Sequence, residues 1–223
     1  MTRLAIFDCD GTLVDGQANV CIAMEEAFAA TGMVAPARAL IRRAVGLSLP
    51  QAMAMLLPES TPLQQDTLAE RYRLAFRSQR EAGLVYEPLF DGMEALLRHL
   101  RADGWTLAVA TGKSDRGLAH CLAEHGIADL FASLQTADRH PSKPHPAMIE
   151  QVLLETSAKP AQAVMIGDTS FDMAMAENAG ITAIGVAWGY HDNDELLASG
   201  ARGVAETIAD LQAMLEDAMQ ERG

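Results

Sequence analysis

The residues best suited to chemistry lie directly after an apolar segment near the start of the chain. Leu4–Phe7 is apolar throughout, Asp8 and Asp10 follow it, and Gly11 allows a sharp turn. A short apolar run of this kind predicts a strand buried on both faces. Two carboxylates at the end of such a strand are costly if they are buried without partners. The pattern therefore favours a functional site over a solvated turn.

Three later segments carry groups of complementary chemistry. Thr111-Gly112-Lys113-Ser114 offers a hydroxyl and backbone N–H groups before a helix, which suits phosphate, although helix capping is the commoner reason for such residues. Lys143 stands between prolines in a loop that they hold rigid, which makes it a candidate fixed cation. Asp168 and Asp172 follow another apolar run, and either could instead be a helix N-cap.

Apolar runs and helical patterns alternate along most of the chain. This alternation predicts an α/β fold, a doubly wound parallel sheet with helices on both faces. The strands are expected at Leu4–Phe7, Thr106–Ala110, Ala163–Ile166 and Thr182–Val186, and the helices at 91–102, Arg116–His125, Pro146–Thr156, Asp172–Ala179 and Thr207–Gln220. Asp91 and Glu94 are spaced as a capping box for the first of these helices.

One long segment interrupts this alternation. Between Asp15 and about Glu87 only helical patterns occur, at Gln17–Thr31, Ala37–Ala44, Leu49–Leu56 and Pro62–Glu81. We therefore expect an inserted all-helical domain over residues 16–87 and a Rossmann-like core formed by residues 1–15 and 88–223. Hinges are expected at the two crossings, near 14–17 and 85–88.

The carboxyl ends of parallel strands share one edge of a sheet, so the candidate residues should gather there. Several carboxylates so close together require a cation. Oxygen ligands select a hard metal ion, and Mg²⁺ suits a phosphate-bearing substrate. The residues thus predict a Mg²⁺ site beside a phosphate-binding segment.

The formal net charge of −13 limits the classes of partner. Proteins that bind nucleic acid or anionic membranes need a basic surface, so we expect neither partner. No apolar run approaches the roughly 18 residues of a transmembrane helix. Three cysteines without CxxC spacing, Cys9, Cys21 and Cys121, are expected to be reduced thiols in a cytoplasmic protein. The oligomeric state is not predictable from these features.

The motifs, taken in order, resemble those of the haloacid dehalogenase superfamily. Asp8-x-Asp10-Gly11-Thr12-Leu13-x-Asp15, Thr111, Lys143-Pro144 and Gly167-Asp168-x-x-x-Asp172 look like its four motifs. The helical insertion is similar to a C1 cap, and the segments Val45–Ser48 and Ala187–Tyr190 are similar to phosphoglycolate-phosphatase-like members.

The resemblance implies roles for individual residues. Asp8 would be the nucleophile that forms an aspartyl-phosphate, and Asp10 would protonate the leaving alkoxide and then activate water. Thr111, Gly112 and Lys143 would hold phosphate oxygens. The metal ligands would be Asp8, the backbone carbonyl of Asp10, and Asp168, while Asp172 would hold Lys143 or metal-bound water.

The same resemblance predicts a Mg²⁺-dependent phosphatase of small phosphorylated metabolites, with phosphoglycolate as the leading substrate candidate. The predicted cap carries seven arginines and seven acidic residues, so the net negative charge lies outside it. Arg42 or Arg43, just before the Val45–Ser48 turn, is expected to contact the carboxylate of the substrate, and Ser48 is a further candidate for substrate specificity. Arg71, Arg73, Arg77 and Arg80 are expected to line the solvent face of a long helix.

Two other functions fit parts of this pattern. A phosphomutase similar to β-phosphoglucomutase would return the phosphoryl group to a sugar instead of releasing phosphate. A receiver domain would hold phospho-Asp as a signal, but receivers are about half this length, lack a helical cap and place the acceptor Asp on a later strand.

Overall fold

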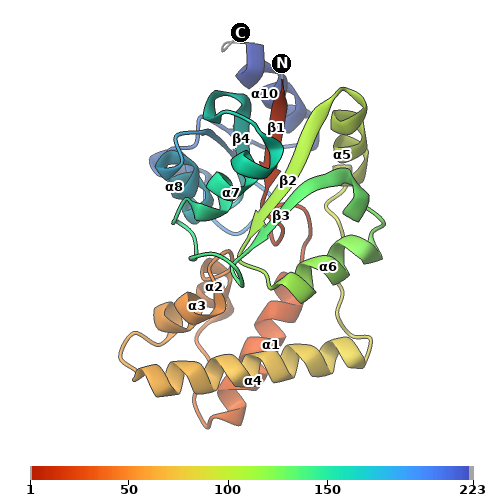
Figure 1. The fold of residues 1–223 in the computed structure, drawn as a ribbon. Coiled ribbons are helices and arrows are strands. Elements are labelled where there is room, and N and C mark those ends of the chain that lie inside the picture. Colours follow the sequence, from red (N-terminus) through yellow and green to blue (C-terminus); the bar gives the residue numbers. More distant parts are fainter. Residues whose placement is uncertain (1, 221–223) are drawn as a thin grey trace.

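A parallel sheet with helices on both faces forms the upper half of the molecule in Figure 1. The computed structural model describes residues 2–220, so the ends of the predicted core range, residues 1 and 221–223, lie outside the described residues. Within them the strand order is β3-β2-β1-β4-β5-β6, and each neighbouring pair is parallel. The strands are β1 (Arg3–Phe7), β2 (Trp105–Thr111), β3 (Phe131–Thr136), β4 (Ala163–Gly167), β5 (Thr182–Val186) and β6 (Val204–Ala205). The predicted fold class is confirmed.

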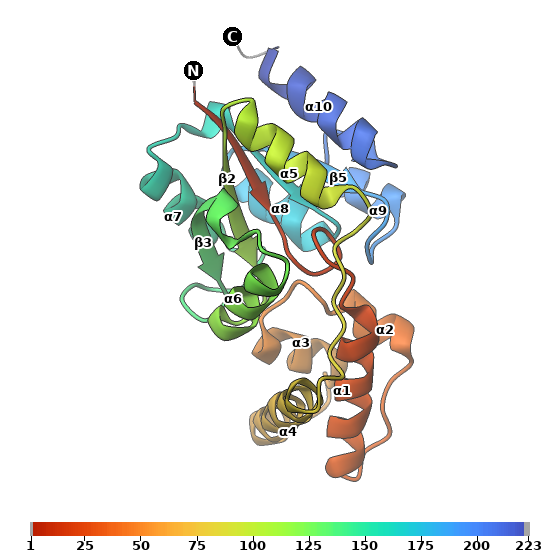
Figure 2. The same cartoon turned by 90° about the vertical axis from the view of Figure 1, so that its right-hand side faces the viewer.

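Side chains of the central strands alternate between two apolar layers. Phe7 and Val109 face one layer with α5 (Met93–Ala102), α6 (Asp115–Glu124) and α10 (Ile208–Gln220). Ile6 and Ala108 face the other with α7 (Ala147–Thr156), α8 (Ser170–Asn178) and α9 (Asn193–Ala198). Because helices cover both faces, the central strands must be apolar throughout, as the sequence shows. Figure 2 shows α5 and α10 together on one side of the sheet.

The chain reverses its direction of winding between β1 and β4. Phe7 pairs with Val109 of β2 and with Ile166 of β4, so the residues that follow all three strands lie side by side. Ligands of doubly wound sheets bind at such a switch point, outside the carboxyl ends of the strands.

Four helices lie beyond this edge of the sheet (Figures 1 and 2). They are α1 (Gln17–Ala30), α2 (Arg38–Arg43), α3 (Leu49–Leu56) and α4 (Pro62–Glu81). They share a separate apolar cluster that includes Met24, Phe28, Met53 and Leu68. The backbone N–H of Asp15 donates to the carbonyl of Pro88 at 2.8 Å, which joins the two crossing segments. We propose that residues 16–87 form the cap domain.

Three elements of the core, β3, β6 and α9, were not predicted from the sequence pattern. In β3, Ser133 and Gln135 are buried polar residues, and both donate hydrogen bonds to Glu155 of α7. The Glu155 carboxylate accepts hydrogen bonds from these polar side chains, so they can be buried in a strand that is not uniformly apolar. The strand β6 has only two residues, and α9 only six.

One smaller expectation was wrong. The predicted capping box at Asp91 does not form, because α5 begins after Gly92, which has no side-chain cap. No helix among the described residues is both long and apolar enough to cross a membrane.

Candidate active site

Asp8 directly follows β1 and is fully buried. Its Oδ1 accepts a hydrogen bond from the N–H of Cys9 at 2.6 Å. Its Oδ2 lies 2.9 Å from the Lys143 ammonium but has no hydrogen-bond donor of suitable geometry among the described residues. Burial raises the pKa of Asp8 to about 7, although Lys143 acts in the opposite direction. Oδ2 is therefore the atom free to take a ligand or attack one.

Asp168 directly follows β4 and is also fully buried. Its two oxygens accept hydrogen bonds from the Thr12 hydroxyl at 2.8 Å and the Tyr190 N–H at 3.0 Å. Burial, together with Asp172 and Asp8, raises its pKa well above the ordinary value. Gly11 adopts a φ of +84°, and a Cβ there would lie 2.2 Å from the Asp168 carboxylate, so the turn admits only glycine.

Lys143 is fully buried and lies between two carboxylates. Its ammonium donates to Asp172 at 2.6 Å and lies 2.9 Å from Asp8. Burial alone would lower the pKa of Lys143, but Asp172 and Asp8 more than offset this and raise it. The lysine is therefore a permanently charged cation at the edge of the sheet.

Asp172 holds Lys143 and closes the first turn of α8. Its second oxygen accepts from the N–H and hydroxyl of Thr169, at 3.1 and 2.7 Å. Thr169 is the N-cap, and Asp172 is its partner in a capping box, so neither Asp168 nor Asp172 is the N-cap itself. The capping bond fixes the carboxylate that positions Lys143.

Oxygens of Asp8, Asp168 and Asp172 all lie within 4.8 Å of one another. Lys143 forms ion pairs with two of these three carboxylates, Asp8 and Asp172, and Asp8 Oδ2 is buried without a hydrogen bond. The excess of negative charge and the unpartnered oxygen fit a hard divalent cation. The carboxylate of Asp10 does not join this group.

Asp10 instead belongs to a second buried charge cluster. The ammonium of Lys113 donates to Asp10 and to Glu87, both at 2.7 Å. The Lys113 side chain is 9% exposed and that of Glu87 is 1% exposed. Burial lowers the pKa of Lys113, but Asp10 and other neighbours raise it well above its ordinary value. The cluster ties the first motif to the segment that leads back from the cap.

Sequence reasoning did not assign a role to Lys113 or Glu87. Lys113 lies inside the tetrapeptide considered for phosphate binding, and Glu87 lies at the predicted boundary of the cap. An acidic residue at a hinge and a lysine at an acidic sheet edge are the signals that could have suggested the pair.

Thr111 ends β2 and is buried beside the end of β1. Its hydroxyl oxygen accepts the N–H of Lys113 at 3.2 Å, which leaves the hydroxyl proton free for another acceptor. The Ser114 side chain caps α6 by accepting the N–H of Gly117, as the capping interpretation predicts. A Cβ on Gly112 would lie 2.5 Å from the carbonyl oxygen of Gly46, so this position allows the cap backbone to approach closely.

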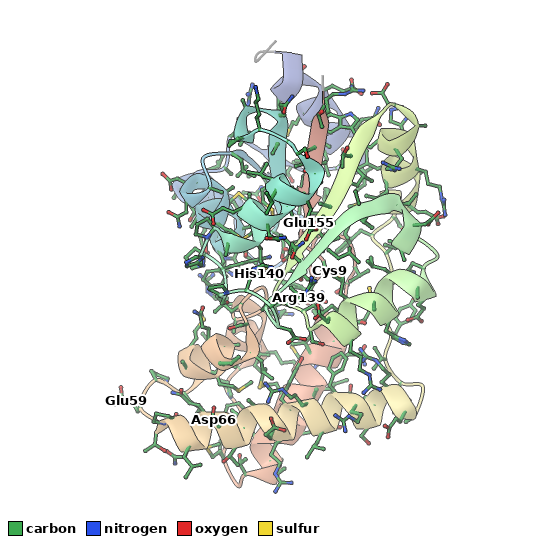
Figure 3. All side chains as sticks on the ribbon, in the orientation of Figure 1. Cys9, Glu59, Asp66, Arg139, His140 and Glu155 are labelled. Atoms are coloured by element: carbon green, nitrogen blue, oxygen red, sulfur yellow. The ribbon has the colours of Figure 1, made fainter. Side chains whose placement is uncertain are left out.

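The side chain of Cys9, between the two aspartates, turns into the core. Its sulfur lies 4.0 Å from that of Cys121, and both residues are buried. Figure 3 labels Cys9 near the boundary between the sheet and the cap helices, with Glu59 and Asp66 at the far end of the cap.

Comparison with known proteins agrees with this arrangement. A family model described as "Haloacid dehalogenase-like hydrolase" matches residues 5–186. The chain belongs to the haloacid dehalogenase-like hydrolase family.

Two relatives of this hydrolase match it over nearly their whole length. "Probable phosphatase IndB" of Dickeya dadantii is 35% identical, over 95% of this chain and 92% of the relative. A phosphoglycolate phosphatase of Vibrio vulnificus is 28% identical, over 94% of each chain. The crystal structure of a predicted phosphatase from Clostridium acetobutylicum superposes with a TM-score of 0.87 at 23% identity, covering 97% of this chain and 99% of that one. The predicted enzyme class, a phosphoric monoester hydrolase, is confirmed.

The cap of the hydrolase meets the core through the turn before α3. The N–H of Ser48 donates to the Ser142 hydroxyl at 2.7 Å, next to Lys143. Ser48 also lines a cavity that extends between the cap and the core. Of the three residues predicted to determine specificity, Ser48 is the one that lines this cavity.

Arg42 and Arg43 do not line the cavity. Arg43 forms an ion pair with Glu195 of α9 at 2.9 Å, and Arg42 donates to Gln17 at 3.2 Å. Both guanidinium groups therefore already have partners within the protein. Residues of α4 reach the cavity instead, namely Tyr72, Arg73, Phe76, Arg77 and Arg80. Arg71, Arg73 and Arg77 are exposed to solvent, as expected, and only Arg80 is partly buried; the sequence did not show that three of these arginines also line a cavity.

Proposed function

We propose that the chain is a Mg²⁺-dependent phosphatase that works through an aspartyl-phosphate on Asp8. The observation that carries this proposal is the buried Asp8 Oδ2, which faces Lys143 and has no hydrogen bond. A carboxylate oxygen held in this way has a free lone pair for attack, and the nearby Lys143 ammonium offsets negative charge at the site.

In the first step Asp8 Oδ2 forms a bond to phosphorus while the bond from phosphorus to the ester oxygen breaks. The leaving alkoxide takes a proton from the carboxyl group of Asp10. Lys143, the Thr111 hydroxyl and the N–H of Gly112 bind the phosphoryl oxygens during transfer. Bound Mg²⁺ supplies positive charge that offsets the repulsion between a carboxylate and a phosphate.

In the second step Asp10, now ionised, takes a proton from water. The water oxygen attacks phosphorus, the bond to Asp8 breaks, and inorganic phosphate leaves. Asp8, Asp168 and the carbonyl of Asp10 are the proposed metal ligands. Asp172 keeps Lys143 in place, since both of its oxygens are already engaged.

The proposed substrate is a small phosphorylated metabolite, with phosphoglycolate as the leading candidate, and the proposed location is the cytoplasm. The three buried, unpaired cysteines support a reducing compartment. A panel of phosphorylated metabolites assayed for kcat/KM with Mg²⁺ tests the activity. Release of phosphate from several members is expected, and a panel without any turnover would contradict the proposal. Formation of a 6-phosphate from a sugar 1-phosphate would instead show a mutase, and a stable phospho-Asp8 would show a receiver.

Mg²⁺ affinity should fall as the pH drops from 8 to 6. Because burial raises the pKa of Asp8 to about 7 and that of Asp168 in the same direction, metal-free protein holds protons at pH 6 that the metal must displace. The dissociation constant, measured by calorimetric titration, should rise about tenfold or more. Equal affinity at the two pH values would show that these carboxylates are not ligands.

A Lys113→Met variant should lose more activity on alkyl phosphates than on p-nitrophenyl phosphate. Lys113 holds Asp10 at 2.7 Å, and the nitrophenolate group leaves without a proton from Asp10. We expect kcat on an alkyl ester to fall about tenfold to a hundredfold further than on the aryl ester. Lys113→Arg should recover part of the loss, and Lys159→Met, on the exposed surface, is the control. Equal losses on both esters would mean that Lys113 does not act through Asp10.

A further inference from the structure

A cavity of about 320 Å³ lies between the cap and the core, and its lining extends from Asp10 to helix α4. The core contributes Gly112, Lys113 and residues at the start of α6. The cap contributes residues of α1, the turn before α3, and one face of α4. The cavity therefore begins at the proposed proton donor and continues away from the proposed nucleophile, where the leaving group of an ester would lie.

Cations without anionic partners gather on this lining. Arg77 of α4 and Arg116 of α6 form no ion pair or hydrogen bond with any described residue, although both line the cavity. Arg80 lies over the Phe76 ring at 5.2 Å, and its buried Nε has no hydrogen-bond partner in the described chain. Three arginines without an anionic partner among the described residues thus line this cavity, in a protein whose net charge is −13; Arg77 and Arg116 are exposed and Arg80 is partly buried.

Neither acidic residue of the same lining, Asp10 or Asp138, forms an ion pair with these three arginines. Asp10 is paired with Lys113 at 2.7 Å, and Asp138 accepts the N–H of Asp115 at 2.9 Å. Arg73, the remaining arginine on the wall, is paired with Glu70. The positive charge of Arg77, Arg80 and Arg116 is thus left for a bound ligand.

The rest of the wall is apolar and the space is large. Val20, Met24, Leu47 and Phe76 line it between the charged groups. At roughly 30 Å³ for each water-sized group, a volume of about 320 Å³ holds about ten such groups. The glycolate leaving group has five non-hydrogen atoms, which is about half of that number.

We propose that this cavity binds phosphate monoesters whose leaving group ends in a second anionic group, a carboxylate or a phosphate, beyond an apolar stretch longer than that of glycolate. The proposal rests on the proposed phosphatase function and names its substrate class, and within that class it favours esters longer than phosphoglycolate. Arg77 and Arg80 bind the second anion from the cap, and Arg116 binds it from the core. Because these arginines come from both sides of the boundary, the anion also holds the cap against the core.

Binding to the Asp8→Asn protein with Mg²⁺ tests the subsite without turnover. Calorimetry would compare phosphate esters of ω-hydroxy acids with two, four and six carbons against the corresponding uncharged alkyl phosphates and α,ω-bisphosphates. We expect the four- or six-carbon acid to bind about tenfold or more tightly than its uncharged counterpart. The bisphosphate series shows whether a second phosphate serves better than a carboxylate.

Variants of single arginines identify the groups responsible. Arg77→Met or Arg116→Met should remove most of the preference for the charged ester and leave the uncharged ester unaffected. Arg77→Lys should retain part of it. Arg71→Met is the matched control, because Arg71 lies on the same helix but does not line the cavity. The proposal is overturned if charged and uncharged esters bind equally, or if the preference persists in both Met variants.

Separate results would contradict the anion subsite and the proposed phosphatase mechanism. If wild-type protein hydrolyses no ester while the binding preference is present, the subsite stands and the proposed phosphatase mechanism is wrong. If uncharged esters are hydrolysed as fast as charged ones and bind as tightly, the mechanism stands and the subsite is wrong.

Discussion

An Asp8→Asn variant is expected to lose a factor of about 10⁴ or more in kcat on every phosphate ester, because an amide cannot form the bond to phosphorus. Initial rates with excess Mg²⁺ measure the effect. Asp129→Asn, an exposed aspartate of the core, is the control and should remain at wild-type activity. An Asp8→Asn protein within tenfold of wild type would remove Asp8 from the proposed mechanism.

The loss should not come from unfolding. Burial raises the pKa of Asp8 to about 7, above the 3.8 of an ordinary aspartate. A group whose pKa is raised by folding keeps its proton in the folded state, so stability falls as the pH rises between these values. Asn carries no such charge, and the metal-free variant should therefore melt at the same Tm as wild type or higher at pH 8. A lower Tm at pH 8, measured with a chelator present, would contradict this reasoning.

A Lys143→Met variant is expected to lose both activity and stability. Lys143 is the cation placed between Asp8 and Asp172, at 2.9 and 2.6 Å, and all three side chains are fully buried. Without it the carboxylates face one another unpaired, which should cost about 3–5 kcal/mol in the free energy of unfolding at pH 8. The phosphoryl oxygens also lose a charged donor, so kcat should fall by a factor of about 10² to 10³.

Denaturant unfolding and steady-state rates measure the two effects of Lys143→Met separately. Added Mg²⁺ should recover part of the stability, because it supplies positive charge to the same carboxylates. Lys159→Met, at an exposed position, should change neither quantity appreciably. A Lys143→Met protein as stable as wild type without metal would show that the three carboxylates do not repel one another as described.

The grouping of the candidate residues at one edge of the sheet was predictable because it depends on local sequence and on the parallel direction of the strands. Apolar strands that are parallel must end at one edge, so Asp8, Thr111 and Asp168 had to meet once the strands were recognised. The interaction of Lys143 with Asp172 followed from the resemblance, and the structure adds the capping bond from Thr169 that fixes it.

The charge partners across long separations were not predictable. Lys113 and Glu87 form an ion pair because the chain that leaves the cap runs beside the first motif. This contact is tertiary, so no periodic sequence pattern predicts it. The arginines of α4 were expected on the solvent face of a long helix, and the sequence does not show that three of them also line a cavity. Which face meets the core depends on how the cap sits over the sheet, and this is a property of the tertiary structure.

The strand β3 shows a third limit. Its buried Ser133 and Gln135 make it unlike an apolar core strand, and the partner that satisfies them, Glu155, lies on the helix that follows. Composition alone cannot show that a buried polar group has a hydrogen-bond partner.

Trapping the aspartyl-phosphate is the most direct test of whether Asp8 carries the phosphoryl group. An Asp10→Asn variant reacting with p-nitrophenyl phosphate and Mg²⁺ should form the intermediate faster than it is hydrolysed, because only the second step then needs the missing base. Acid quench, borohydride reduction and peptide mass spectrometry locate the acyl phosphate. We expect about one nitrophenolate released per chain in a burst, with homoserine at position 8. Steady turnover without a burst and with Asp8 unmodified, or modification at another aspartate, would contradict the proposed mechanism.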